Sequence, residues 1–277
     1  MSATDTSPPD RGFDAGKAAL ALRDSRARRE RLQPLPAGLA PRTVEEGAAA
    51  QRALAELGGN ANPAGFKIGA TAKRMQEYLG LTGPAAGFMA ASGLHASGAV
   101  LRFADFVQPG IECEIVVKLA RDLPPGPCTA EQAAAAVGEF TAGIEIVENR
   151  YGDLAALGTP TLIADQVFHA ACVRGESLPH PSLPGGLDWR GLDIPALAGR
   201  LAVDGVVQME GKAGDLLGHP MNCLAWLAAS PVAAAFGGLK AGQVVMLGSV
   251  TPPIWLQGPC RATVDFSPLP VVRVQFV

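Results

Sequence analysis

The stretch from Ile111 to Leu119, IECEIVVKL, decides most of what can be predicted about this chain. Apolar residues alternate with Glu112 and Glu114 at its start, and β-branched residues follow, which is the pattern of a β-strand. Side chains two residues apart on a strand leave the same face, so both carboxylates point to one side and Cys113 to the other. The strand therefore presents a pair of carboxylates in an apolar setting.

This carboxylate pair has two interpretations. Like charges on one face repel each other near a core unless a cation or a shared proton intervenes, and Mg²⁺ or Mn²⁺ suits carboxylate oxygens. The alternative is the solvated face of an amphipathic strand. A third carboxylate, Glu145, lies in the β-like stretch GIEIVENR and strengthens the metal interpretation. Nothing in the sequence alone brings the two strands together, so both interpretations stay open on spacing.

The segments before this strand predict a helical N-terminal arm. Residues 1–12 are expected to form a frayed tail, and residues 15–32 a polar-faced helix that ends at a Pro-rich segment. Thr43 and Glu46 have the spacing of a capping box, and they predict a helix that continues to Leu57.

The rest of the chain has short elements separated by turns. Expected strands are 111–119, 143–147, 202–209, 243–248 and 271–277, and expected helices are 71–79, 129–137 and 221–229, with the apolar segment GFKIG before them. Short strands with a few helices between them favour an α+β fold over a doubly wound sheet. We expect an arm at residues 1–64 and one catalytic domain at residues 65–277.

Composition excludes several function classes. The net charge of −3 offers no basic field for nucleic acid, and 5% aromatic residues do not make a stacking platform. Five scattered cysteines without a CxxC pair argue against a disulfide framework or a zinc ribbon. There is no nucleotide-binding glycine motif, no signal peptide and no long apolar run. We therefore expect a soluble, cytoplasmic protein that acts on a small molecule.

Several blocks of the sequence resemble one enzyme family. They are GFKIGATAKRMQEYLG, IECEIVVKLARDLP, GIEIVENRY, IADQV, GHPMNCLAWLA and LKAGQVVMLGSVTPP. Their order and spacing are similar to those of 2-keto-4-pentenoate hydratases, which belong with 4-oxalocrotonate decarboxylases to the fumarylacetoacetate hydrolase superfamily. The resemblance covers roughly residues 45–277. It implies a rolled mixed β-sheet core with a helical N-terminal region, and a homo-oligomer that can associate with another enzyme of aromatic meta-cleavage catabolism.

The resemblance also implies the chemistry of the site. Glu112, Glu114 and Glu145 would bind Mg²⁺ or Mn²⁺, and a 2-oxo acid would chelate the ion, which stabilises the enolate. Proton delivery at C5 and addition of water at C4 would give a 4-hydroxy-2-oxo acid. Loss of a β-carboxylate would instead make the protein a 2-oxo-3-enedioate decarboxylase. A third reading is a non-catalytic partner that keeps the metal site.

Further site residues follow from the matching blocks. Lys67 in GFKIG is the candidate general base or electrostatic helper, against the reading of a surface lysine. Arg150 would orient a carboxylate of the site, or else serve in a structural ion pair. Ser249 and Thr251 resemble the family's GSLT segment, which caps the substrate carboxylate, although a plain turn is the alternative.

The sequence departs from the family around the substrate. Ala85 stands where the family usually has an acidic residue, and Pro252 replaces a glycine after the GSLT-like segment. The family's DNAS stretch keeps its acid as Asp165, a candidate substrate-binding residue, but bulky apolar residues follow. His169, next to that stretch, is a candidate replacement for the lost acid–base group. The departures predict a different or more apolar substrate.

Overall fold

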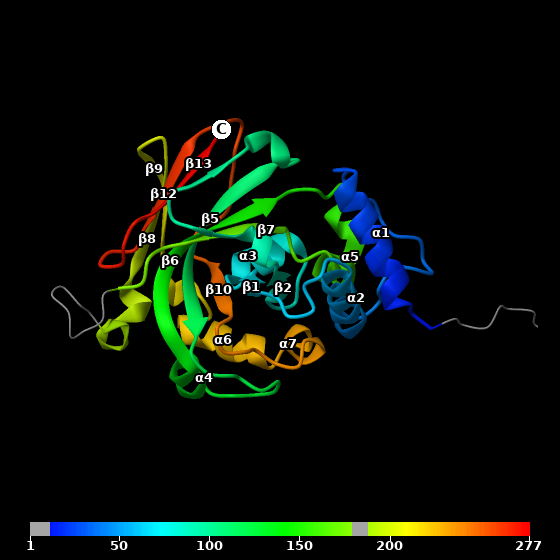
Figure 1. The fold of residues 1–277 in the computed structure, drawn as a ribbon, viewed down its shortest axis with the longest axis horizontal. Helices are drawn as coiled ribbons and strands as arrows, with labels where there is room; N and C mark the ends of the chain where they lie inside the picture. Colours follow the sequence, from blue (N-terminus) through cyan, green and yellow to red (C-terminus); the bar gives the residue numbers. More distant parts are fainter. Residues whose placement is uncertain (1–11, 179–187) are drawn as a thin grey trace, which may run out of the picture.

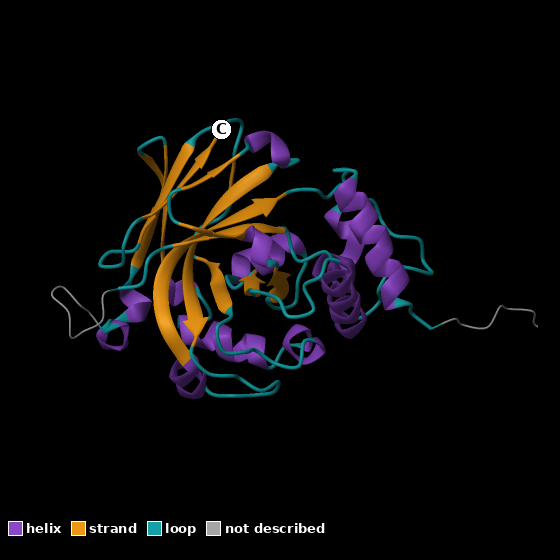
Figure 2. Cartoon of the chain, viewed as in Figure 1, coloured by secondary structure: helices purple, strands orange, loops and turns teal. Residues whose placement is uncertain are grey.

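The computed structural model describes residues 12–178 and 188–277, and the tail expected at residues 1–12 lies almost wholly outside these ranges. Two β-sheets form the centre of the molecule, and one of them curls around the other elements (Figure 1). Helices gather at one side and beneath the curled sheet (Figure 2). The fold is mixed α and β with a rolled sheet, as predicted from the family resemblance.

The larger sheet carries the long strand that contains Glu112 and Glu114. Its order is β2 (Ala85–Met89), β1 (Gly65–Gly69), β10 (Val244–Ser249), β5 (Pro109–Leu119), β6 (Val137–Glu148), β7 (His169–Arg174) and β3 (Leu94–Ala96), with β11 (Ile254–Trp255) also on β5. The pairs β1–β10 and β3–β7 are parallel, and the other pairs are antiparallel. Strands β5 and β6 are both longer than predicted, and they pair along almost their whole length.

The smaller sheet packs against β5 and β6. Its order is β4 (Ala99–Leu101), β13 (Val272–Phe276), β12 (Arg261–Asp265), β8 (Ala198–Val203) and β9 (Val206–Lys212). A Cβ added to Gly199 on β8 would lie 2.8 Å from the Cys113 sulfur and 2.4 Å from the Phe266 ring. Cys113 therefore faces the smaller sheet, and the glutamates beside it face the other way, as alternation predicts.

One strand prediction was wrong in this sheet. The single strand expected at residues 202–209 is a hairpin, in which β8 and β9 pair across Asp204 and Gly205. Both turn residues have positive φ, 48° and 82°. An Asp-Gly pair is a strong signal for such a two-residue turn, because both positions need left-handed backbone.

The helices surround the sheets in two groups. Helices α1 (Ala15–Ala27), α2 (Val44–Leu57) and α5 (Leu154–Ala164) pack together at one side, while α4 (Ala130–Ala136), α6 (Pro220–Ala228) and α7 (Pro231–Ala235) lie under the curled sheet (Figure 1). Helix α3 (Lys73–Leu79) follows β1. Short 3₁₀ helices lie at Ala91–Gly93, Phe103–Asp105, Trp189–Gly191, Ile194–Ala196 and Ala213–Asp215.

The first helix is shorter than predicted, and the second begins and ends as predicted. Helix α1 ends at Ala27, five residues short of the predicted end at residue 32. Thr43 caps α2 by accepting a hydrogen bond from the Glu46 N–H at 3.2 Å. The Glu46 carboxylate accepts from the Arg42 N–H at 2.6 Å, and hydrogen bonds from Arg42 and from the Thr43 N–H lower the pKa of Glu46. The Glu46 side chain therefore reaches back to the start of the helix.

A buried glutamine ties α2 to the sheet. The Gln51 amide donates hydrogen bonds to the carbonyl oxygens of Ala86 (3.0 Å) and Ile163 (2.5 Å), and its oxygen accepts from the Phe88 N–H (3.0 Å). Because these bonds satisfy the buried amide, they fix α2 against both β2 and α5. Across residues 12–178 and 188–277, no helix combines the length and apolar character needed to cross a membrane.

Candidate metal centre and its cavity

The pairing of β5 with β6 brings three carboxylates together. Glu112 lies directly opposite Glu145 in the ladder, and Glu114 lies opposite Gly143. One carboxylate oxygen from each of Glu112, Glu114 and Glu145 lies within 4.8 Å of the others. The sequence predicted the glutamates, and the sheet register supplies the contact between strands that spacing alone could not.

The oxygen atoms of this group divide into partnered and unpartnered ones. Glu114 Oε2 accepts a hydrogen bond from the Gly248 N–H at 2.9 Å. Glu145 Oε1 lies 2.7 Å from His169 Nδ1 and 3.3 Å from Lys67 Nζ. Glu114 Oε1 and Glu145 Oε2 are buried without a hydrogen-bond partner among the described residues. Such orphaned carboxylate oxygens are costly, and a divalent cation fits this donor set.

Burial and neighbouring charges shift the pKa values of the three carboxyl groups in different directions. Burial and then the neighbouring Glu145 charge raise the pKa of Glu112 to about 8. Burial, Glu145 and Glu112 raise the pKa of Glu114 well above its usual range. Burial would raise the pKa of Glu145 too, but the Lys67 charge and the His169 hydrogen bond outweigh it and lower that pKa to about 2. Without a cation, the group therefore holds protons that a metal ion would displace.

Gly248 shapes this centre through its backbone. Its φ is 108°, and an added Cβ would lie 2.4 Å from the Thr71 hydroxyl oxygen. Only glycine combines that conformation with that close approach. The position thus directs the Gly248 N–H at Glu114.

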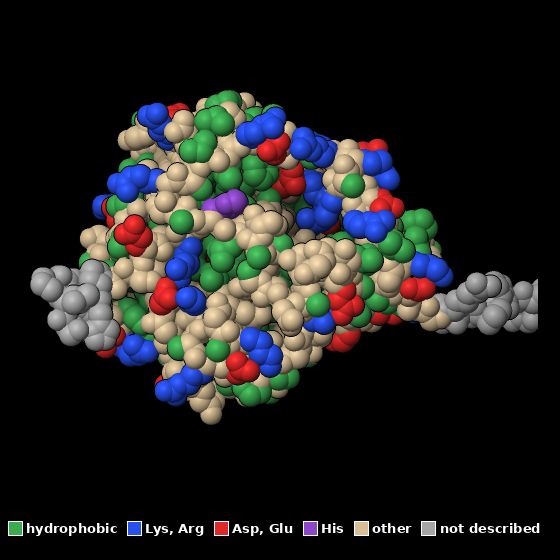
Figure 3. Space-filling model, in the orientation of Figure 1, with side chains coloured by type: hydrophobic (Ala, Val, Ile, Leu, Met, Phe, Trp, Pro, Cys, Tyr) green, Lys and Arg blue, Asp and Glu red, His purple; other side chains and the backbone are tan. Residues whose placement is uncertain are grey.

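A cavity of about 250 Å³ opens beside the carboxylates. Lys67 and Glu112 line its inner part, whereas Glu114 and Glu145 lie behind them and are fully buried. The remaining lining residues are Gly69, Ala70, Thr71, Ala72, Met75, Leu79, Val147, Val167, Phe168, Ser249, Thr251, Pro252, Pro253 and Trp255. On the face shown in Figure 3, acidic and basic side chains are interspersed.

Ser249 and Thr251, the candidates for binding a substrate carboxylate, both line the cavity. The Ser249 hydroxyl donates to the Thr251 carbonyl oxygen at 2.6 Å and accepts from the Thr251 N–H at 3.2 Å. The Thr251 hydroxyl is buried without a partner among the described residues. Ser249 therefore holds the loop, and Thr251 has a hydroxyl left for a ligand.

Arg150 and Asp165 lie together but away from the cavity lining. The Arg150 guanidinium forms an ion pair with Asp165 and approaches Glu148 at 3.5 Å. Arg26 of α1 binds the same aspartate, from Nε to Oδ1 at 2.7 Å and from Nη2 to the carbonyl oxygen at 2.7 Å. This arrangement is a structural ion pair, which was the alternative role for Arg150. No pattern in the sequence pointed to the participation of Arg26.

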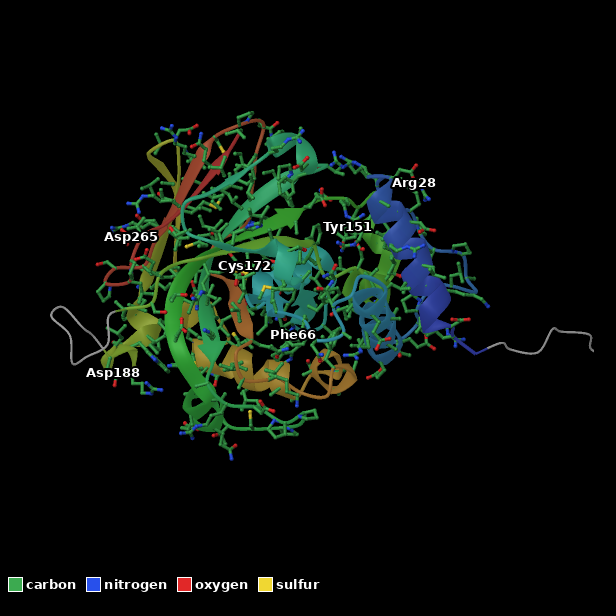
Figure 4. All side chains as sticks on the ribbon, viewed as in Figure 1. Arg28, Phe66, Tyr151, Cys172, Asp188 and Asp265 are labelled. Atoms are coloured by element: carbon green, nitrogen blue, oxygen red, sulfur yellow. The ribbon has the colours of Figure 1, made fainter. Side chains whose placement is uncertain are left out.

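The ion pair supports a strained turn that forms part of the cavity. Gln166, Val167 and Phe168 all have positive φ, 62°, 52° and 65°. This conformation costs roughly 1–2 kcal/mol for each L-residue, and a β-branched residue adopts it rarely. The Gln166 amide donates to the Phe88 carbonyl oxygen at 2.8 Å, and the Tyr151 hydroxyl oxygen accepts from the Phe168 N–H at 3.2 Å. Tyr151 lies between the sheet and α1 (Figure 4).

His169, the candidate replacement for the lost acid–base group, is buried beside Glu145. His169 is 4% exposed, does not line the cavity, and contacts Glu145 rather than open space. Burial lowers the pKa of His169 against the opposing pull of Glu145. Ala85 is buried in β2 opposite Gly69. Sequence reasoning missed Met75, Leu79 and Trp255 as lining residues, although Met75 and Leu79 have the four-residue spacing of one helix face.

A family profile matches most of the chain. The profile described as "Fumarylacetoacetate (FAA) hydrolase C-terminal" matches residues 57–274. The chain belongs to the fumarylacetoacetate hydrolase family. The match includes all three glutamates and the strands of both sheets, with β13 included up to residue 274.

Curated relatives in the fumarylacetoacetate hydrolase family are named as hydratases. The chain is 32% identical over 186 residues to a 2-keto-4-pentenoate hydratase of Burkholderia vietnamiensis. The aligned region covers 67% of this chain and 67% of the relative. It is 32% identical over 168 residues to a 2-hydroxyhexa-2,4-dienoate hydratase of Comamonas testosteroni, and that aligned region covers 60% of each protein. The 4-oxalocrotonate decarboxylase of Pseudomonas putida G7, complexed with magnesium and adipate, superposes with a TM-score of 0.80 at 22% identity and covers 95% of this chain and 97% of that one.

Proposed function

We propose that this protein is a metal-dependent hydratase acting on a 2-oxo or 2-hydroxy dienoic acid such as 2-keto-4-pentenoate. The observation that carries the proposal is the convergence of three carboxylates, two of them with orphaned oxygens, behind a cavity lined by Lys67 and Thr251. The hydratase names of relatives at 32% identity support the reaction class.

Glu112, Glu114 and Glu145 would hold the ion, Mg²⁺ or Mn²⁺. A hard divalent cation supplies Lewis acidity, which lowers the cost of negative charge on the keto oxygen of a 2-oxo acid. The remaining steps fall to side chains of this chain.

Lys67 is the proposed proton carrier. It is 2% exposed yet lines the cavity, and its ammonium lies 3.3 Å from Glu145 Oε1. From there the Lys67 ammonium can donate a hydrogen bond to an oxygen of the substrate, or exchange a proton with a carbon atom of the substrate. His169 is a positioning residue, because its Nδ1–H donates to Glu145 and so fixes the orientation of that carboxylate.

Thr251 and Ser249 are proposed to bind the substrate carboxylate. The unpartnered Thr251 hydroxyl would donate to it, and Ser249 keeps the loop in place. Asp165 and Arg150 act one step further away, since their ion pair supports the turn that carries Phe168. We also propose that residues 1–64 form a supporting arm for a catalytic domain at residues 65–277.

Turnover tests the proposal directly. The protein with Mg²⁺ or Mn²⁺ should consume the dienol absorbance of 2-hydroxypenta-2,4-dienoate and form the 4-hydroxy-2-oxo acid, and a chelator should stop it. Release of carbon dioxide from 2-oxo-3-hexenedioate in place of hydration would identify a decarboxylase. Metal binding without turnover of either compound would identify a non-catalytic partner, and the hydratase proposal would fail.

We further propose that the chain assembles as a homo-oligomer. Val100 on β4, Val206 and Val207 on β9, and Val277 at the end of the chain are 50–61% exposed. Strands β4 and β9 are the two edges of the smaller sheet, and apolar edge strands favour pairing with another chain. Light scattering after gel filtration measures the mass, and mixing with other meta-cleavage enzymes tests for a complex.

A further inference from the structure

The cavity extends along one face of β5 and β6. Glu112 and Gly110 on β5 lie on the same face of the sheet as their register partners Glu145 and Val147 on β6. Val147 lines the cavity, and Trp255 pairs with Gly110, where an added Cβ would lie 2.7 Å from the indole ring. Two residues along a strand span about 7 Å. An apolar surface therefore begins about 7 Å from the carboxylates, beyond the first carbons of a 2-oxo acid bound there.

Other elements complete this apolar surface. Met75 and Leu79, four residues apart on α3, line the cavity from one helix face. The Phe168 ring lies 6.4 Å from the Trp255 ring and 4.5 Å from the Tyr151 ring, measured between centroids. We call Met75, Leu79, Val147, Phe168 and Trp255 the apolar end, and Glu112, Glu114, Glu145 and Lys67 the carboxylate end.

The ionisable side chains described in the cavity lining lie at one end. Among the lining residues whose side chains the structure describes, they are Lys67 and Glu112, both at the carboxylate end. Arg150 does not line the cavity, and its guanidinium pairs with Asp165 and Glu148 while its buried Nη1 has no partner among the described residues. A second carboxylate at the apolar end would lose hydration without gaining a cation, which weakens binding by tenfold or more.

We propose that this site selects 2-oxo acids whose far end is an uncharged hydrocarbon group and discriminates against dicarboxylic 2-oxo acids. The inference rests on the proposed function, because it places the oxo-acid group of the ligand at the carboxylate end. Each methylene buried at the apolar end strengthens binding by about fourfold. A cavity of about 250 Å³ limits the hydrocarbon group to a short one.

A matched set of saturated acids tests this selectivity without turnover. Isothermal titration calorimetry of the full chain with Mg²⁺ would compare 2-oxobutanoate, 2-oxohexanoate and 2-oxoadipate. The last two have the same carbon chain and differ only in the terminal group. We expect 2-oxohexanoate to bind more tightly than 2-oxobutanoate by about fourfold per methylene, and 2-oxoadipate to bind at least tenfold more weakly than 2-oxohexanoate.

A charge placed at the apolar end should reverse the preference. Leu79→Lys puts an ammonium beside the far end of the ligand, so 2-oxoadipate should gain about tenfold over 2-oxohexanoate. Leu57→Lys is the matched control, since Leu57 is an exposed leucine at the end of α2, and it should change neither affinity.

The outcomes separate the two proposals. Equal or tighter binding of 2-oxoadipate by the unchanged protein, with metal-dependent binding of 2-oxobutanoate intact, overturns the selectivity and leaves the hydratase proposal standing. Absence of metal-dependent binding for all three acids overturns both. The wild-type comparison decides the matter even where Leu79→Lys fails to fold.

Discussion

The two ends of the cavity are built by different kinds of structure. The three glutamates of the carboxylate end stand on β5 and β6, two long central strands whose ladder fixes every side-chain direction, and Lys67 is added from β1. Apart from Val147 on β6, the apolar end is assembled from the seven-residue helix α3, the two-residue strand β11 and a turn of left-handed residues. A register shift would disrupt the whole sheet, whereas a changed turn alters one side of the cavity. Substitutions can therefore change the residues that contact the far end of the substrate without changing the glutamates that would bind the metal.

The strongest test of the carboxylate end removes one ligand. Glu145→Gln should lower the affinity for Mn²⁺ by about 10³-fold, because a neutral amide replaces a buried carboxylate beside Lys67. Calorimetric titration measures the affinity. Glu139→Gln on the same strand is the control, since Glu139 pairs with Lys118 and Arg174 outside the group, and it should bind metal normally. Unchanged affinity in Glu145→Gln would refute the ligand assignment.

Lys67 separates chemistry from metal binding within the carboxylate end. Lys67→Met should lower kcat by about 10²-fold or more while KM and metal affinity change far less, because a proton carrier acts in the transition state. Steady-state kinetics at saturating metal provide the measurement. Lys118→Met, on β5 but partly exposed, should keep wild-type kcat. A parallel loss of metal affinity would instead make Lys67 structural.

The carboxylate end should also respond to pH. Glu112, with its pKa raised to about 8, and Glu114, with its pKa raised well above its usual range, hold protons at pH 6 that a cation must displace, so Mn²⁺ affinity should fall by at least about tenfold per pH unit below 8. In the metal-free protein the same raised pKa stabilises the fold at low pH, and this contribution is lost as pH rises through 8. Titrations at pH 6, 7 and 8 measure the slope. A flat profile would contradict this protonation state.

A substitution on α1 should alter the apolar end of the cavity. Arg26→Ala removes two hydrogen bonds to Asp165 and loosens the turn that carries Phe168. We expect KM to rise severalfold and unfolding free energy to fall by about 1 kcal/mol, since Arg26 is partly exposed, with metal affinity unchanged. Arg23→Ala, on the exposed side of α1, is the control. Equal kinetics for both variants would show that the turn needs no support from α1.

This contrast also explains what the sequence could reveal. Alternation along IECEIVVKL placed Glu112 and Glu114 on one face, and local patterns predict such strands well. Arg26 and Asp165 are 139 residues apart, and no periodicity links an arginine on a polar helix to an aspartate after another helix. Trp255 reaches the cavity through a two-residue pairing with β5 that no local pattern signals. Long-range contacts of single side chains are the part that local patterns miss.

The Arg26–Asp165 contact has a consequence for the order in which the protein takes shape. During synthesis, the residues of α1 are made long before the ribosome adds Asp165, so Arg26 lacks its aspartate partner until then. The turn that carries Phe168 can be secured only after α5 has folded and the newly made aspartate has met the first helix. The apolar end of the cavity is therefore completed late, by a contact between Arg26 and an aspartate made 139 residues after it.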